Sequence, residues 1–75
     1  AMADMKYSVV LEWDEHEQVF VTYVPALDFL STFGATREEA LARTREAITG
    51  YLEAATKAGI EVPAASDYEI LDIAV

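Results

Sequence analysis

The sequence contains no cysteine, only two prolines and three glycines, and a single histidine among its 75 residues. Without cysteine the chain forms neither disulfides nor thiolate metal sites, and an intracellular, cytoplasmic location is expected. No apolar run reaches the roughly 18 residues that a membrane span needs, so no membrane association is expected. Residues 1–4 lack the basic start and apolar region of a signal peptide, and they are expected to be flexible or in part an expression remnant.

Basic residues are scarce as well, because five Lys and Arg stand against fourteen Asp and Glu and give a formal charge of −9. Nucleic-acid binding depends on neutralising phosphates with Lys and Arg, so direct nucleic-acid binding is not expected. An acidic surface suits a basic protein partner through long-range steering. Solubility alone also explains such a charge, and both interpretations stay open.

The length predicts one domain over residues 1–75, with a small core. Apolar residues make up 53% of the chain, which is high for so little interior. Some apolar surface is therefore expected to stay exposed in the monomer. This favours a homo-oligomer or a bound partner.

Alternating or β-branched patterns predict strands over residues 6–13, 18–24 and 29–33. The polar residues 14–17 separate the first two strands and predict an antiparallel hairpin. Pro25 ends the second strand because it has no N–H to donate. Gly34 is expected to permit the bend that follows the third strand.

A helix is predicted to begin at Thr36, because Thr36 and Glu39 have the spacing of a capping box, and to end at Gly59. Gly50 lies within it, which indicates either a close approach to the sheet or a tolerated glycine. A last strand is predicted over residues 68–75. The apolar stripe expected on the helix comprises Leu41, Thr44, Ile48, Tyr51, Leu52, Ala55 and Ala58.

The predicted fold class is therefore α+β, in the order β-β-β-α-β, with a small, mainly antiparallel sheet and one helix packed on one of its faces. The hairpin carries two apolar sets, and the smaller one is expected to be partly covered by another subunit. Scattered surface hydrophobic residues are the alternative. The larger set is Tyr7, Val9, Leu11, Val19, Val21 and Tyr23, and the smaller is Val10, Phe20 and Val24.

No catalytic constellation, metal site or cofactor motif is predicted. His16 stands on a polar turn between two glutamates, without the converging ligands or the nucleophile that its chemistry would need. Four acids crowd the hairpin without a basic neighbour in the sequence, namely Glu12, Asp14, Glu15 and Glu17. They are interpreted either as contacts for basic groups of a partner or as simply exposed.

Several short motifs, in order and spacing, resemble the HicB-like antitoxin family from residue 6 to residue 63. They open the first strand, close the second, start the helix, recur within it and follow it. They are Met5-Lys6-Tyr7, Phe20-Val21-Thr22-Tyr23-Val24-Pro25-Ala26-Leu27, Gly34-Ala35-Thr36-Arg37-Glu38-Glu39-Ala40-Leu41, Ala47-Ile48, Tyr51-Leu52-Glu53-Ala54 and Val62-Pro63.

This resemblance implies a reduced ribonuclease-H-like fold without its active site. It also implies a non-enzymatic protein that neutralises a small basic ribonuclease toxin and forms dimers or tetramers. Many members carry a DNA-binding segment after the last strand, whereas this sequence stops at Val75, so DNA binding is not carried over. Where the family often has Pro-Gly-Cys, this chain has Asp28-Phe29-Leu30.

Three hypotheses follow from the sequence. The leading one is an antitoxin-like binding module, the second a stand-alone oligomeric scaffold or small-ligand domain without a toxin, and the third a metal-dependent nuclease remnant that uses Glu12 and Asp14. The residues expected to contact a partner are Asp14, Glu15, Glu17, Tyr23, Asp28 and Phe29.

Overall fold

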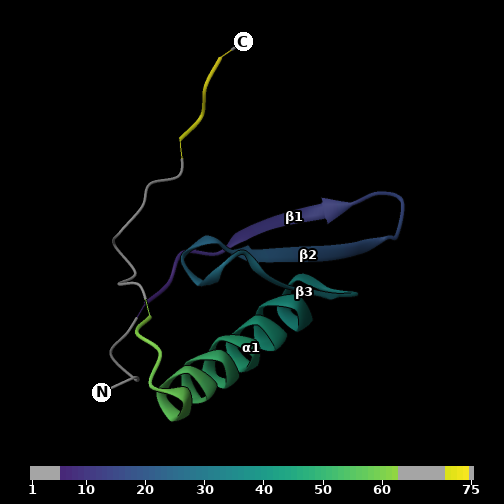
Figure 1. Cartoon of the computed structure of the whole chain (residues 1–75). Helices are drawn as coiled ribbons and strands as arrows, with labels where there is room; N and C mark the ends of the chain where they lie inside the picture. The colour runs from purple at the N-terminus through teal and green to yellow at the C-terminus, as the bar shows by residue number, and fades with distance from the viewer. Residues whose placement is uncertain (1–5, 63–70, 75) are drawn as a thin grey trace.

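The computed structural model describes residues 6–62 and 71–74. Three strands form one antiparallel sheet in the order β1-β2-β3, and one helix follows them. The strands are β1 (Val10–Asp14), β2 (Val19–Val24) and β3 (Leu30–Gly34), and the helix is α1 (Arg37–Ala58). Figure 1 shows α1 running beneath the sheet, and α1 packs mainly against β3 and less against β2. The predicted α+β fold is confirmed for this part of the chain.

The predicted strand boundaries differ from the observed ones at both ends of the sheet. Residues 6–9 precede β1 without strand pairing, and Asp14 is the last residue of β1. Phe29, predicted to begin the third strand, lies in the turn before β3. Pro25 ends β2 as expected and opens η2 (Pro25–Leu27), a short 3-10 helix.

The helix begins and ends where its sequence signals predict. The Thr36 side chain accepts a hydrogen bond from the Glu39 N–H at 3.0 Å, and the Glu39 carboxylate accepts one from the Ala35 N–H at 3.1 Å. These bonds satisfy N–H groups that the first turn leaves free. Gly59 has a φ of +70°, and the Ile60 N–H returns to the Ala55 carbonyl at 2.9 Å, which is the Schellman ending.

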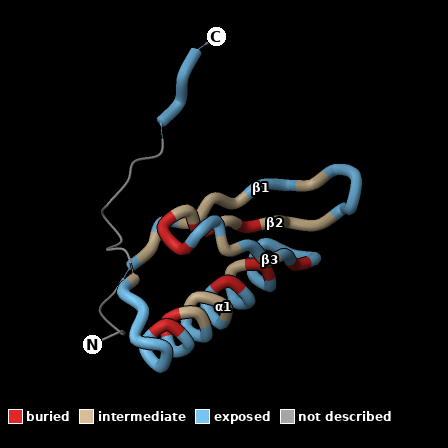
Figure 2. The backbone as a smooth tube through the Cα atoms, viewed as in Figure 1, coloured by how far each residue is buried: buried red, intermediate tan, exposed pale blue. Residues whose placement is uncertain are grey.

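A small core joins β2, η2 and α1. Its buried members are Val24, Leu27 and Leu52. Figure 2 shows buried positions on the side of α1 that faces the sheet and on β2 and η2. Six partly buried side chains surround this cluster, namely Tyr7, Val9, Leu30, Ile48, Tyr51 and Val62. Most of the predicted helix stripe is confirmed, although Ala58 is exposed and the buried Ala40 was missed.

The structure decides between the two interpretations of Gly50 and gives Gly34 a role that the sequence did not predict. A Cβ on Gly50 would meet nothing within 4 Å, so the helix does not approach the sheet closely there. A Cβ on Gly34 would lie 2.5 Å from the Ala40 nitrogen, a distance that no real side chain tolerates. Gly34 is therefore required by the contact between β3 and the first turn of α1, and the bend that follows does not rest on a positive φ at Gly34.

The assignment of apolar residues to the sheet faces was wrong. Trp13 pairs with Phe20 and Leu11 with Thr22, so odd positions of β1 share a face with even positions of β2. The helix covers the face that carries Thr22 and Val24, not the one with Val19, Val21 and Tyr23. The larger set predicted as core is thus split between the two faces.

The predicted last strand lies partly outside the described residues, because residues 68–70 and 75 are among those not described. Its described part, residues 71–74, is not paired with the sheet, and all four residues are exposed. Leu71 and Ile73 keep 69% and 78% of their surface exposed. The sheet of the described chain therefore has three strands, with β1 and β3 at its edges.

Candidate functional site

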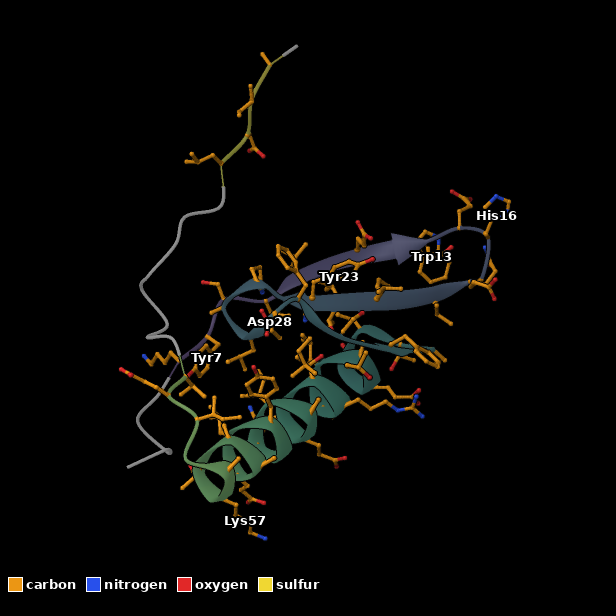
Figure 3. The ribbon with its side chains drawn as sticks, viewed as in Figure 1. Tyr7, Trp13, His16, Tyr23, Asp28 and Lys57 are labelled. Atoms are coloured by element: carbon orange, nitrogen blue, oxygen red, sulfur yellow. The ribbon has the colours of Figure 1, made fainter. Side chains whose placement is uncertain are left out.

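The hairpin between β1 and β2 ends in a four-residue turn, residues 15–18. The Asp14 carboxylate accepts a hydrogen bond from the Glu17 N–H at 3.1 Å, and the Gln18 N–H returns to the Asp14 carbonyl at 2.8 Å. Gln18 closes the turn in the left-handed region with a φ of +57°. The chain is thereby reversed so that Glu15, His16 and Glu17 project from the end of the sheet, where Figure 3 shows His16.

Asp14, Glu15 and Glu17, called here the tip acids, lack a basic partner within the described ranges 6–62 and 71–74. The one ion pair found there joins Arg43 and Glu39 on α1 at 3.4 Å and involves none of the tip acids. Exposed pairs of that kind contribute little to stability, about 0.2–1 kcal/mol. The tip acids therefore leave a local excess of negative charge at one end of the sheet.

The sheet face turned away from α1 is called the open face. Strand register places residues of all three strands on it, because Glu12 pairs with Val21 and Val21 pairs with Phe33. Phe33 is 55% exposed, and its neighbours on this face are only partly buried. The members of the open face are Val10, Glu12, Asp14, Val19, Val21, Tyr23, Ser31 and Phe33.

A groove of about 320 Å³ lies on the open face beside the hairpin end. Its floor is apolar, with Val19, Val21 and the Phe33 ring, while Asp14 and Glu17 stand at one end. Ser31 and Thr32 complete its lining from β3. The volume is at the lower limit of small-molecule sites, about 300–1,000 Å³, so the groove has room for a side chain or a small ligand.

Tyr23 and Glu12 interact on the open face from diagonal positions of β1 and β2. The Tyr23 hydroxyl donates a hydrogen bond to the Glu12 carboxylate, and this bond together with the negative charge of Glu12 raises the pKa of Tyr23. Smaller contributions come from partial burial and from Asp14. Tyr23 thus lies on the open face with Glu12 and Asp14, and its role as a contact residue stays a prediction.

The loop between β2 and β3 contains the other two predicted contact residues. Asp28 and Phe29 both have a φ of +57°, in the left-handed region that glycine favours. A bulky residue such as phenylalanine rarely adopts this conformation, and yet Phe29 is 66% exposed. The loop therefore presents an aromatic ring to solvent at a conformational cost of about 1–2 kcal/mol.

The structure separates the predicted contact residues into two groups. The tip acids lie at the end of β1 and in the turn before β2, and the pair Asp28–Phe29 follows the end of β2, with Figure 3 showing His16 and Asp28 toward opposite ends of the sheet. Six residues of extended strand separate the groups by about 17–20 Å. Sequence reasoning missed Val19, Val21 and Phe33 as parts of a site, because their face depends on a register that only pairing reveals.

A third surface lies on the helix side of the sheet, beyond the area that α1 covers. The Trp13 and Phe20 rings meet edge to face with centroids 4.9 Å apart, and Trp13 is 45% exposed. Leu11 follows them on the same face and is only half-buried. We call Leu11, Trp13 and Phe20 the aromatic patch. Glu12 and Asp14 alternate with Leu11 and Trp13 along β1, so the carboxylates of β1 lie on the opposite face of the sheet.

The metal-nuclease hypothesis required converging acids. Within the described part of the chain, no group of three or more His, Cys, Asp or Glu side chains is placed to hold a metal ion. His16 is exposed on the turn. Among the same residues, no helix combines the length and the apolar character needed to cross a membrane.

Comparisons with known proteins identify the family of this chain and a relative. The model of the HicB-like antitoxin family of bacterial toxin–antitoxin systems matches residues 7–73. The UPF0150 protein Ta0767 of Thermoplasma acidophilum is 39% identical over 66 residues, which cover 88% of this chain and 94% of that protein. No solved structure matches the chain. Because the family model spans nearly the whole sequence, the chain belongs to the HicB-like antitoxin family.

Proposed function

We propose that this protein is an antitoxin that neutralises a small, basic ribonuclease by binding it, without catalysing a reaction itself. Membership of an antitoxin family supports a toxin partner in general. The observation that carries the more specific proposal is the group of tip acids that lack a basic partner within the described chain, next to an apolar groove. Acids held this way attract and orient a cationic protein surface.

The net charge of the whole chain also favours binding to a basic protein. A net charge of −9 on 75 residues produces a field that raises the association rate with a cationic protein, and salt screens this field. A ribonuclease needs basic residues to hold its phosphate-rich substrate. A surface that covers those residues with carboxylates would exclude the RNA and so inhibit the enzyme.

Self-association forms the second part of the proposal, and the aromatic patch is the surface that suits it. Two copies of a chain with a charge of −9 repel each other, so a contact between copies favours a surface poor in carboxylates. The aromatic patch meets this condition, whereas the open face carries Glu12 and Asp14. Exposed aromatic side chains are also enriched at interfaces. We therefore propose a dimer, or a tetramer, in which Trp13 and Phe20 are covered by another copy.

The cytoplasm is the compartment that this function requires, since a toxin that cleaves cellular RNA acts there. A cysteine-free sequence is compatible with a reducing compartment. A stand-alone domain that binds a small ligand remains the second candidate, and the groove volume of about 320 Å³ is the observation in its favour.

Co-expression with any small basic protein that is encoded next to this gene tests the antitoxin proposal. We expect a stable complex in gel filtration, loss of ribonuclease activity, and affinity that falls steeply between low and high salt. A charge-matched variant pair sharpens the result, because Asp14→Asn/Glu17→Gln and Glu46→Gln/Glu53→Gln each remove two negative charges. Only the first pair should weaken the complex. If no small basic protein binds at low salt, the antitoxin proposal is wrong and the small-ligand candidate replaces it.

Sedimentation of the chain at micromolar concentration tests self-association separately. We expect a species of at least twice the 8.3 kDa chain mass. The variant Trp13→Ser should shift the equilibrium to the monomer, whereas Phe33→Ser, which removes an exposed ring on the other face, should leave it unchanged. A chain that is already monomeric before substitution would overturn this part of the proposal.

A further inference from the structure

The groove on the open face combines two features that one ligand type matches. Its floor consists of the aliphatic side chains of Val19 and Val21 and the ring of Phe33, which offer no charge and few polar groups. Its end carries the Asp14 and Glu17 carboxylates. A long apolar stem with a cationic head satisfies both parts at once, and only lysine and arginine side chains have that form.

No lysine or arginine of the described chain lines this groove. Arg43 is the cation nearest to the Phe33 ring, with its guanidinium carbon 5.7 Å from the ring centroid. That guanidinium lies over the Phe33 ring, donates to the Phe33 carbonyl at 3.2 Å and pairs with Glu39 at 3.4 Å, so its partners are Phe33 and Glu39 and not the acids of the groove. Asp14 and Glu17 form no ion pair in the described part of the chain.

We infer that the groove receives one lysine or arginine side chain from the basic partner protein, with its stem on Val19, Val21 and Phe33 and its charged head between Asp14 and Glu17. This inference rests on the proposed function and names the feature that the partner contributes. The Ser31 hydroxyl lies in the same lining and offers a further acceptor. The groove makes a general charge attraction specific, because the head reaches the carboxylates only when the stem lies along the apolar floor.

The acids remain available although Asp14 already stabilises the turn. Its Oδ1 atom accepts the Glu17 N–H, which leaves the second oxygen for a cation. Substituting Asp14 with Asn retains an oxygen that can accept the same N–H bond, so the turn should persist while the charge is lost. Glu17→Gln likewise keeps the side-chain length. The variant Asp14→Asn/Glu17→Gln therefore tests the charge without removing the hairpin.

A nuclear magnetic resonance titration of the full chain with short peptides tests the inference without the unknown partner. Three blocked tripeptides that differ only in the central residue serve as probes: lysine, arginine and the uncharged norleucine, which has the four-carbon stem of lysine without its ammonium group. We expect the lysine and arginine peptides to shift the amide signals of Val19, Val21, Ser31 and Phe33 at millimolar concentration. The norleucine peptide should shift them at least threefold less at the same concentration, because it lacks the ion pairs.

The variants then locate the binding. Asp14→Asn/Glu17→Gln should weaken the lysine peptide about three- to tenfold, whereas Glu46→Gln/Glu53→Gln should not, although both bring the net charge from −9 to −7, since 5 − 12 = −7. Glu46 and Glu53 are exposed on α1 and serve as the matched control. Equal shifts with norleucine, shifts spread over all acidic residues, or no shifts at the groove would each overturn the inference.

The experiments give different results if the groove is not a contact site and if the protein is not an antitoxin. A toxin that binds the wild-type chain and the Asp14→Asn/Glu17→Gln variant equally would overturn the groove as a contact site and leave the antitoxin function standing. Peptide binding at the groove, in a chain that binds no small basic protein, would overturn the antitoxin function and leave the groove as a receptor for basic side chains.

Discussion

The hydroxyl oxygens of Thr22 on β2 and Thr44 on α1 lie 2.6 Å apart, and both residues are buried. Thr44 also lies 2.7 Å from the Ala40 carbonyl and donates its only proton there. Thr22 must therefore be the donor to Thr44, since a hydroxyl has one proton, and the alternative acceptor at Thr32 is 3.5 Å away. This chain of two bonds joins the sheet to the helix.

The direction of these bonds predicts unequal effects of two isosteric substitutions. Thr44→Val leaves the buried Thr22 hydroxyl without a good acceptor and should lower the free energy of unfolding by about 1–3 kcal/mol. Thr22→Val leaves the Thr44–Ala40 bond intact and should lower it by less, about 0.5–1.5 kcal/mol. The double variant should be more stable than the sum of the single effects implies, because no orphaned hydroxyl remains. Urea denaturation of the four proteins measures this cycle, and strict additivity would contradict it.

Gly34 and Gly50 have different surroundings, which predict opposite effects of alanine substitution. Gly34→Ala places a methyl group against the Ala40 backbone and should destabilise the fold by about 1–3 kcal/mol, since β3 and the first turn of α1 must separate. Gly50→Ala meets open space in a helix interior and should stabilise it by about 0.5–1 kcal/mol. Thermal denaturation of both variants tests the pair. A stabilising Gly34→Ala substitution would show that the contact is looser than described.

Two substitutions of Phe29 distinguish its effect on stability from its effect on partner binding. Phe29→Gly should raise the free energy of unfolding by about 0.5–1 kcal/mol, because glycine adopts the left-handed conformation without strain and the exposed ring loses little packing. Phe29→Ala removes the same ring but keeps the strain, and should not stabilise. If Phe29 contacts a partner, both variants should weaken the complex equally. Denaturation and binding measurements on the two proteins therefore distinguish strain from contact, and equal stability of the two variants would disprove the strain.

The pair Tyr23–Glu12 predicts how stability changes at alkaline pH. Because the folded-state pKa of Tyr23 is raised above 10.0, the pair contributes its full stabilisation below that pH and loses it as the pH rises through the raised value. Glu12→Gln removes the charge and should lower the pKa of Tyr23 toward 10.0. Ring-carbon chemical shifts followed between neutral and strongly alkaline pH, with Tyr23→Phe to assign the signal, measure it. An unchanged Tyr23 pKa in Glu12→Gln would exclude Glu12 as the cause.

Local signals in the sequence predicted the end of an element correctly wherever a single residue fixes the backbone conformation. Pro25 ends β2, Thr36 with Glu39 starts α1, and Gly59 ends it, because each supplies or withholds a hydrogen bond or a dihedral angle on its own. The acidic hairpin end was also visible as composition. The role of Gly34 could not be predicted, because nothing in the sequence indicates that a Cβ at this position would clash with the Ala40 backbone.

The sequence by itself determined the order of the β-β-β-α elements, the ends of α1 and the acidity of the hairpin. Tertiary structure alone decided which side chains share a face. A four-residue turn pairs Trp13 with Phe20, whereas a turn one residue longer or shorter would have placed Trp13 beside Val19 or Val21. That register places Val19 and Val21 on the face of Asp14, and the separate register of β2 with β3 adds Phe33 to it. Thr22 lies on the opposite face, where it meets Thr44. Side chains alternate between the two sheet faces along each strand, so the pattern within one strand cannot specify which residues of the next strand share its face.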